Sequence, residues 1–235
     1  MSLSDGFAAL YPTSVLQQVA LTTFDGSGGS LRREMQVVFG EGGRRGDMLI
    51  RFTSPSALKG TGVLLLEHST LYVYLPALRR SRRVSVGQMR DAFFGSDFSY
   101  QDLLPKRASD FTLIDRGEAG DCEVFILLPS QSSQLSYSKF DVCVDHSVSR
   151  IQWIDVVAGA GKKRLVVSYD EENRRSVSSV RVVADQGRVV SELELLESRS
   201  IKAPGVALFG VSNLDRGSAR RDRKLVRDVG SPNER

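Results

Sequence analysis

The sequence of 235 residues has few of the features that mark catalytic, metal-binding or membrane-spanning proteins. Apolar runs such as Val63 to Leu66 are short, so no segment resembles a transmembrane helix. The two histidines, His68 and His146, stand apart from any cluster of Cys, His and Asp, which argues against a metal site. A Gly-x-Ser-x-Gly motif and a phosphate-binding loop are both missing. We therefore expect no catalytic residues, no metal and no cofactor.

Positive charge is concentrated at the end of the chain. The formal net charge is +4, and residues 216–235 hold seven basic and three acidic side chains, so residues 1–215 are neutral overall. This balance describes a tail and does not indicate a nucleic-acid-binding domain. We expect one domain over residues 1–215, followed by a basic tail over residues 216–235 whose order the sequence leaves open.

Short segments with alternating apolar residues recur along most of the chain, separated by Gly, Ser, Asn and Asp. No long helical pattern interrupts them, so parallel βαβ units are not expected. The run Val63–Leu66 is apolar at both parities, which predicts a strand covered on both faces. The sequence predicts a mainly β fold with short helices (α+β). Its core would be one curled antiparallel sheet of about ten to eleven strands.

An aromatic segment, "FFGSDFSYQDLLP" at residues 93–105, interrupts the strand pattern. Ser99 fits a helix N-cap with Asp102 three residues later, and Pro105 would end the helix after about one turn. Each large apolar side chain gains roughly 1.5–3 kcal/mol on burial, so this helical plug must pack on an apolar surface. One interpretation is that the plug completes the core. The other is that it is a lid over a cavity for an apolar ligand.

The two cysteines, Cys122 and Cys143, lie in the strand-like segments 122–129 and 137–145. In a hairpin centred near residue 133 they would be directly opposed, with Cβ atoms about 4.5–5.5 Å apart, near disulfide range. An oxidising compartment would favour a disulfide. Two free, buried thiols are the alternative, and the sequence leaves both open.

The run "LRRSRR" carries four arginines: Arg79, Arg80, Arg82 and Arg83. A solvated strand edge is the favoured interpretation, because charge on an exposed edge prevents pairing with another sheet. The functional alternative is a basic docking patch for anionic lipid headgroups or a partner, in which each basic residue contributes ~1 kcal/mol. Nucleic-acid binding is less favoured, since no aromatic residues alternate with the arginines.

The segment "GVLLLEHSTLYVYLPALRRSRRVS…FFGSDFSYQDLL" resembles the periplasmic outer-membrane lipoprotein-sorting protein family, which includes the LolA carrier and the LolB receptor. The most specific element is Phe94–Leu103, where Gln101 replaces the usual acidic residue. "YSKFDVCVDHSVSRIQWIDVV" and "LFGVSNLDRG" are also similar to family elements, so the resemblance spans roughly residues 15–217. The long N-terminal helix of the carriers is shortened or missing here, and the tail is extra.

The resemblance implies an unclosed antiparallel β-barrel whose concave apolar face is covered by helical segments. It implies a non-catalytic periplasmic carrier that binds the acyl chains of lipoproteins, or another lipid, for transport or sorting toward the outer membrane. We expect a monomer with a membrane-associated delivery partner and no nucleic acid. The N-terminus shows no secretory leader. The residues expected to line the hollow and its lid are Phe52, Leu64, Leu66, Tyr72, Tyr74, Phe94, Phe98, Tyr100, Leu103, Phe125, Leu127 and Trp153.

A second hypothesis about the interior of the sheet is compatible with the same sequence. The interior of the sheet could be filled by the chain's own side chains, and the protein would then be a structural or interaction module. Such a module would bind partners through the Arg79–Arg83 edge or the basic tail. A one-residue slip in strand register would also exchange the two faces of a strand and change which residues line the hollow.

Overall fold

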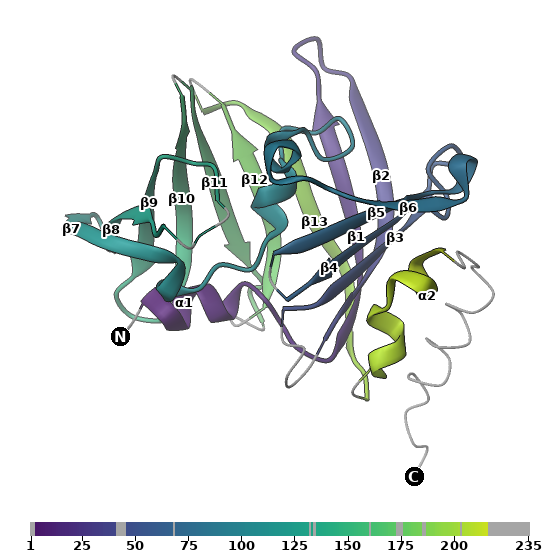
Figure 1. The fold of residues 1–235 in the computed structure, drawn as a ribbon. Coiled ribbons are helices and arrows are strands. Elements are labelled where there is room, and N and C mark those ends of the chain that lie inside the picture. Colours follow the sequence, from purple (N-terminus) through teal and green to yellow (C-terminus); the bar gives the residue numbers. More distant parts are fainter. Residues whose placement is uncertain are drawn as a thin grey trace. The chain divides into compact units, whose positions relative to one another are not determined.

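The computed structural model describes residues 3–40, 46–67, 69–131, 133, 135–159, 161–172, 176–184, 187–202 and 204–215. They form one antiparallel sheet of thirteen strands in the order β6-β5-β4-β3-β2-β1-β13-β12-β11-β10-β9-β8-β7 (Figure 1). The sheet does not close, because β6 and β7 are its two edge strands. The expected fold class, mainly β with short helices and one unclosed antiparallel sheet, is confirmed.

The strands follow one another with few intervening helices. The strands are β1 Val15–Phe24, β2 Ser30–Phe39, β3 Met48–Ser54, β4 Gly62–Leu66, β5 Thr70–Leu75, β6 Arg80–Arg83, β7 Phe111–Ala119, β8 Cys122–Pro129, β9 Lys139–Asp145, β10 Ile151–Ala158, β11 Gly161–Tyr169, β12 Val177–Val183 and β13 Val189–Ser200. The helices are α1 Leu3–Ala9 and α2 Val211–Asp215, with 3₁₀ turns η2 Pro76–Leu78, η3 Val86–Arg90, η4 Tyr100–Leu103, η5 Ala108–Asp110 and η7 Val206–Phe209. No helix of the described residues is long and apolar enough to cross a membrane.

The expectation of ten to eleven strands was too low. Alternation of apolar residues does not reveal the edge strand β6, because its sequence, Arg-Ser-Arg-Arg, contains no apolar residue. It is nevertheless a strand, because it pairs with β5 from Leu75↔Arg80 to Tyr72↔Arg83. Main-chain hydrogen bonding therefore extends the sheet beyond the segments that the hydrophobic pattern reveals.

The chain divides into two compact units that share strands β1, β2 and β13. Unit 1 comprises Met1–Tyr11, Leu21–Arg32 and Val86–Leu195, and unit 2 comprises Pro12–Ala20, Arg33–Ser85 and Leu196–Arg235. The single domain expected over residues 1–215 stays a prediction. The expected basic tail, residues 216–235, lies outside the described residues.

In unit 1, strands β8 to β12 have an apolar and a polar face. Phe125 pairs with Val142, which pairs with Ile154, and this row continues through Leu165 to Val182. All five side chains are buried, and paired residues of neighbouring strands lie on one face of a sheet. We call this surface the apolar face of unit 1; it is formed by Phe125, Leu127, Phe140, Val142, Ile154, Val156, Leu165 and Val182.

In unit 2, strand β4 is buried on both faces, as its sequence predicts. Leu64 and Leu65 point to opposite faces, and neither is exposed to solvent. Leu64 lies between Leu49 of β3 and Tyr72 of β5. The residues on the other face, beginning with Val63, are equally buried. A strand of this kind lies within the core and not at a solvated surface.

Candidate functional site

The helical plug forms the turn that its sequence predicts. Ser99 is extended and precedes η4, and its main-chain N–H donates to Asp102 Oδ2 at 2.6 Å. The turn is a 3₁₀ helix, which ends at Leu104 before Pro105. Before it, the Phe93 N–H donates to the carbonyl of Phe98 at 2.7 Å, which closes residues 93–98 into a tight loop. The plug is therefore an ordered element with its own hydrogen bonds.

A buried polar cluster surrounds the carboxylate of Asp102. Its Oδ2 accepts hydrogen bonds from Ser99 Oγ at 2.9 Å and from the ammonium of Lys163, and its Oδ1 accepts from Tyr137 Oη at 2.7 Å. The Asp102 side chain is 1% exposed and that of Lys163 is 21% exposed, so this ion pair is largely shielded from water. Burial and the negative charge of Asp102 together raise the pKa of Tyr137, which keeps the phenol protonated as a donor.

A second lysine lies against the same turn. Lys106 is buried, and its Nζ donates to the carbonyls of Asp102 and Leu104, both at 3.1 Å. Burial lowers the pKa of Lys106 to about 8, although the nearby Asp102 charge opposes this shift. The carbonyl of Leu104 also accepts from Tyr11 Oη at 2.9 Å. The end of the plug is thus fixed by side chains that satisfy its main-chain carbonyls.

Two strands of unit 1 hold the plug against the apolar face. Ser191 of β13 is buried, and its Oγ accepts from the Asp97 N–H at 3.0 Å and donates to Asp97 Oδ2 at 2.7 Å. Lys163 of β11 donates to the Asp97 carbonyl at 3.0 Å. Ser191 pairs with Val182 and Lys163 pairs with Val156, so both anchoring side chains project from the apolar face. We call these contacts of Asp97, Asp102, Lys163 and Ser191 the latch.

Of the lid residues expected from the sequence, Phe98 is buried deepest, at 2% exposure, directly after Asp97 of the latch. Phe94, Tyr100 and Leu103 are half-buried. The Phe94 and Tyr100 rings both contact Phe93 edge to face, with centroids 5.0 and 5.5 Å from its own. The aromatic residues of the plug therefore pack partly on one another.

The three expected hollow residues of unit 1 lie on different faces. Phe125 and Leu127 are on the apolar face, with 4% and 1% exposure. Trp153 pairs with Cys143 and Val166, so it lies on the opposite face. There Arg164 lies over its ring at 4.2 Å from the centroid. The two oxygens of Asp155 accept from Arg164 at 2.6 and 2.8 Å, which holds the guanidinium in this position.

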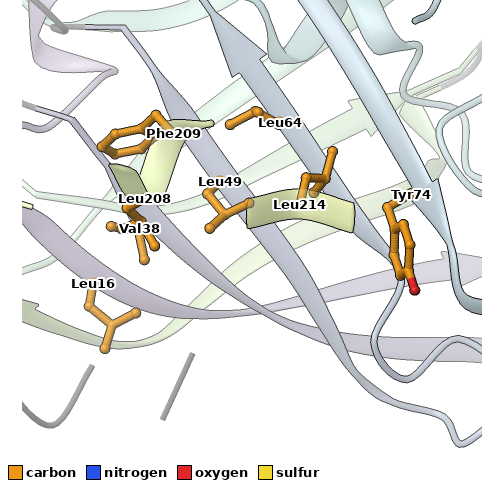
Figure 2. Packing of buried hydrophobic residues seen from close by; sticks show 8 residues of the cluster. All are labelled: Leu16, Val38, Leu49, Leu64, Tyr74, Leu208, Phe209 and Leu214. Carbon is orange, nitrogen blue, oxygen red and sulfur yellow. The ribbon is translucent and has the colours of Figure 1, made fainter. Parts of the chain in front are cut away.

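In unit 2, four of the five expected hollow residues belong to or pack on one apolar cluster, which also contains residues of η7 and α2. Figure 2 shows side chains from strands β1 to β5 together with those of η7 and α2. Leu66 and Tyr72 pack on this cluster, whereas Phe52 follows Arg51 in β3 and points to the opposite face. The buried members of the cluster are Leu16, Val38, Leu49, Leu64, Tyr74, Leu208, Phe209 and Leu214.

The segment 206–215, here called the C-terminal cover, is fixed by polar contacts as well. Arg51 Nη2 donates to the carbonyls of Asn213 and Leu214, both at 3.2 Å. The Ser81 N–H of β6 donates to Asp215 Oδ1 at 2.7 Å. A Cβ added at Gly62 would lie 2.6 Å from Leu214 Cδ1, so glycine allows the close approach of the cover. This face of unit 2 is filled by the protein itself.

A disulfide joins Cys122 and Cys143, whose Cα atoms are 5.4 Å apart. The expected strand register was wrong by two residues. Cys122 pairs with Asp145, and Cys143 pairs with Val124, so the two cysteines are diagonal neighbours and not directly opposed. The diagonal arrangement still brings the sulfur atoms together. The observed hairpin is centred one residue further along the chain than the expected one, which shifts the register by two.

Three of the four arginines lie in the edge strand β6, in agreement with the favoured interpretation of this segment, and Arg79 precedes it. Arg79, Arg80, Arg82 and Arg83 are all exposed. The described residues contain no group of three or more His, Cys, Asp and Glu side chains placed to hold a metal ion. His68, which the sequence sets apart from such groups, lies outside the described residues.

Sequence reasoning missed the residues that anchor the plug and the cover. Lys163 and Ser191 are 61 and 94 residues from their plug partners, and nothing near them in sequence marks them. The one available signal is that Ser191 directly follows two valines, Val189 and Val190. For the cover, the sequence offered the similarity of "LFGVSNLDRG" to a family element, but no sign of the strand face that receives it.

Comparisons with known proteins agree with this architecture. A family model described as "uncharacterized protein" matches residues 45–186. An outer membrane lipoprotein-sorting protein domain from Vibrio parahaemolyticus has a similar structure, with a TM-score of 0.74 and 21% identity over 86% of this chain and 91% of that chain. A DUF1329 family protein from Desulfovibrio piger gives a TM-score of 0.74 and 20% identity over 90% of this chain and 96% of the other.

A LolA superfamily protein from Nitrosomonas europaea gives a TM-score of 0.69 and 17% identity over 88% of this chain and 95% of the other. No curated protein sequence matches the chain. The family model covers more than half of the sequence, and the solved structures have the same fold as this chain. The chain therefore belongs to the family of uncharacterized proteins whose model covers residues 45–186, and it has the LolA-like fold of outer-membrane lipoprotein-sorting proteins.

Proposed function

We propose that this protein is a non-catalytic carrier that binds the acyl chains of lipoproteins, or another lipid, on the apolar face of unit 1. The plug is the lid of this site. The observation that carries the proposal is the way the plug is attached. Polar side chains, Lys163 and Ser191, project from an otherwise apolar face and hold the plug through hydrogen bonds and one ion pair.

A lid attached in this way can be released without rearranging the sheet. If the latch opens, its polar groups exchange their partners for water, at a net cost of about 0.5–1.5 kcal/mol for each ordinary hydrogen bond. The apolar side chains beneath would then be exposed, which is unfavourable unless an apolar ligand replaces the plug. An acyl chain supplies such a surface, because each buried CH₂ group contributes about 0.8 kcal/mol.

The proposed site is smaller than the set of residues that the sequence suggests. It comprises the lid residues and the two expected residues of the apolar face, all within unit 1. Leu64, Leu66, Tyr72 and Tyr74 are not included, because they pack with the C-terminal cover. The proposed ligand-contacting residues are Phe94, Phe98, Tyr100, Leu103, Phe125 and Leu127.

The proposed location is the periplasm. One of the solved structures with this fold is an outer membrane lipoprotein-sorting protein domain, although the 21% identity shows a shared fold alone. The disulfide between Cys122 and Cys143 supports an oxidising compartment, where such bonds persist. In this compartment a carrier would protect acyl chains from water between two membranes. Release to a membrane-associated partner is part of the same proposal.

The first experiment is native mass spectrometry of the protein purified from a cell envelope, followed by organic extraction. Bound acyl species at near-unit stoichiometry support the carrier and give the class of its ligand. A clean apo mass, together with no uptake of an environment-sensitive apolar dye, would overturn the proposal.

Substitutions locate the site in the same dye assay. Ser191→Ala removes one anchor of the plug and should speed dye uptake. Ser168→Ala is the matched control, because Ser168 lies in β11, two strands from β13, and accepts from Arg181 at 3.1 Å. Phe98→Asp should abolish retention of the ligand. Equal uptake by the two serine variants, with Phe98→Asp unchanged in binding and in stability, would exclude the lid.

A structural or interaction module is the second candidate function. The C-terminal cover favours it, since it fills one face of unit 2 with Leu208, Phe209 and Leu214. If unit 1 is filled in the same way, the plug is permanent core and the function lies on the surface. In that case no apolar dye binds to the native protein, whether or not Ser191 is replaced.

A further inference from the structure

The turn η2 and the edge strand β6 form a strongly basic surface with an exposed apolar tip. All four arginines of this segment are exposed, and Leu78 at the end of η2 is 60% exposed, more than any other large apolar side chain of the described residues. We call this surface the basic edge; it consists of Leu78, Arg79, Arg80, Arg82 and Arg83. All of its residues belong to unit 2.

The basic edge presents charge on both faces of the sheet. Arg80 and Arg82 pair with residues of one face of β5, and Arg83 pairs with Tyr72 on the other. In the described part of the chain, no ion pair joins any of the four arginines to an acidic side chain. The positive charge of this surface is therefore directed to solvent.

A fifth positive charge adjoins the edge. Lys59 is exposed in the turn that follows β3, and a Cβ added at its neighbour Gly60 would lie 3.6 Å from Pro76 of η2. Asp215 contacts the edge, where it accepts a hydrogen bond from the Ser81 main chain. One carboxylate does not balance five cations.

The same contact with Asp215 argues against a strand-adding protein partner. Addition of a peptide strand to a sheet requires free main-chain groups along the edge. Here the N–H of Ser81, at the centre of β6, is already satisfied by Asp215 Oδ1 at 2.7 Å. A partner of this edge must therefore recognise the side chains. A solvated edge that only prevents aggregation explains the charges, but it does not explain an exposed leucine at their end.

We propose that the basic edge docks the protein on a membrane surface rich in anionic lipid headgroups. Each arginine near such a surface is attracted by its negative potential, and Leu78 inserts among the headgroups. Reversible membrane association commonly combines an apolar anchor with a polybasic patch, and this surface supplies both. The inference goes beyond the proposed carrier function and uses none of the residues of the proposed ligand site.

The test is co-sedimentation of the full chain with phosphatidylcholine vesicles that contain or lack phosphatidylglycerol, at low and high salt. We expect binding to the anionic vesicles only, weakened by salt because the attraction is screened. Replacing Arg79, Arg80, Arg82 and Arg83 by Gln should weaken this binding at least tenfold. Leu78→Asn should weaken it by a smaller factor that salt does not change.

Two control variants separate the basic edge from general charge and from other exposed leucines. Arg32, Arg107, Arg188 and Arg199, all exposed elsewhere, are replaced by Gln, which gives the same net charge. Leu196→Asn removes another exposed leucine. Equal losses in the test and control variants, equal binding to both kinds of vesicle, or no binding by the unmodified chain would each overturn the proposal. Dye uptake should stay unchanged in all of these variants, so a failure here is distinct from a failure of the carrier.

Discussion

Replacement of Lys163 by methionine tests the latch most directly. The ammonium of Lys163 donates to the Asp102 carboxylate and to the Asp97 carbonyl, and it is the one cation in contact with this carboxylate among the described residues. Methionine keeps the length and the apolar part of the side chain but removes the charge. The substitution therefore leaves the Asp102 charge buried without its ionic partner.

The expected loss of unfolding free energy follows from the burial of the pair. Removing one partner of a fully buried ion pair costs about 3–5 kcal/mol, because an uncompensated charge remains. Lys163 is 21% exposed, so water partly replaces the lost contact, and we expect about 2–4 kcal/mol. Ser99 and Tyr137 continue to donate to Asp102, which limits the loss further.

The neighbouring Lys162 provides a matched control. Its ammonium forms an ion pair with Asp155 at 2.9 Å, but the lysine side chain is 57% exposed. Exposed pairs contribute about 0–1 kcal/mol, so Lys162→Met should have little effect. Urea unfolding of both variants measures the difference. Two losses within about 1 kcal/mol of each other would refute the assignment of Lys163 as a latch residue.

Limited trypsin digestion adds a local measurement to the global one. Lys106 directly follows the plug and is 4% exposed, whereas Arg107 beside it is exposed. Cleavage after Arg107 can occur in the closed protein, but cleavage after Lys106 requires the plug to lift. We expect Lys163→Met to raise the fraction of fragments that end at Lys106. An unchanged ratio of the two fragments in a destabilised variant would mean that the sheet, and not the plug, has loosened.

Three further predictions concern titration, packing and the disulfide. The folded protein loses the Lys106 proton above pH about 8, while the unfolded chain keeps it to 10.5, so stability should rise with pH between these values. This rise should be missing in Lys106→Met when the two unfolding curves are compared. Gly62→Ala should destabilise by about 1–3 kcal/mol through contact with the Arg51 guanidinium and with Leu214, and a Leu214→Ala background should relieve the second part, as a double-mutant cycle would show. Replacing Cys122 and Cys143 by Ser should cost about 3 kcal/mol in urea unfolding, and an unchanged midpoint would contradict this.

The local parts of the plug could be predicted from the sequence because they depend on residues three positions apart. Ser99 and Asp102 have the spacing of a helix N-terminus, and the structure places the Asp102 carboxylate on the Ser99 N–H. What the carboxylate does besides could not be predicted. Its partners Tyr137 and Lys163 come from segments 35 and 61 residues away, and their position depends on the pairing of the sheet.

Strand alternation separates the two faces of a strand, but it does not say which face lines the interior. Alternation shows that Leu64 and Leu65 point in opposite directions, but both are apolar and both are buried. Nothing in this strand indicates which of the two meets the C-terminal cover. Trp153 presented the same difficulty, since a large aromatic residue can pack in a core or, as here, against the guanidinium of Arg164. Parity needs a second reference, such as a known contact, before it identifies an interior.

The most specific sequence element of this protein, Phe94–Leu103, is better explained by its attachment to the sheet than by a role in a chemical reaction. Asp102 completes the turn of the plug through Ser99 and at the same time forms the ion pair with Lys163 that holds the plug to the sheet. Both oxygens of this carboxylate accept hydrogen bonds from the protein itself. One side chain thus couples formation of the turn to attachment of the plug. A ligand that displaces the plug must break the ion pair while the turn can stay intact, which gives the proposed carrier a closed empty state.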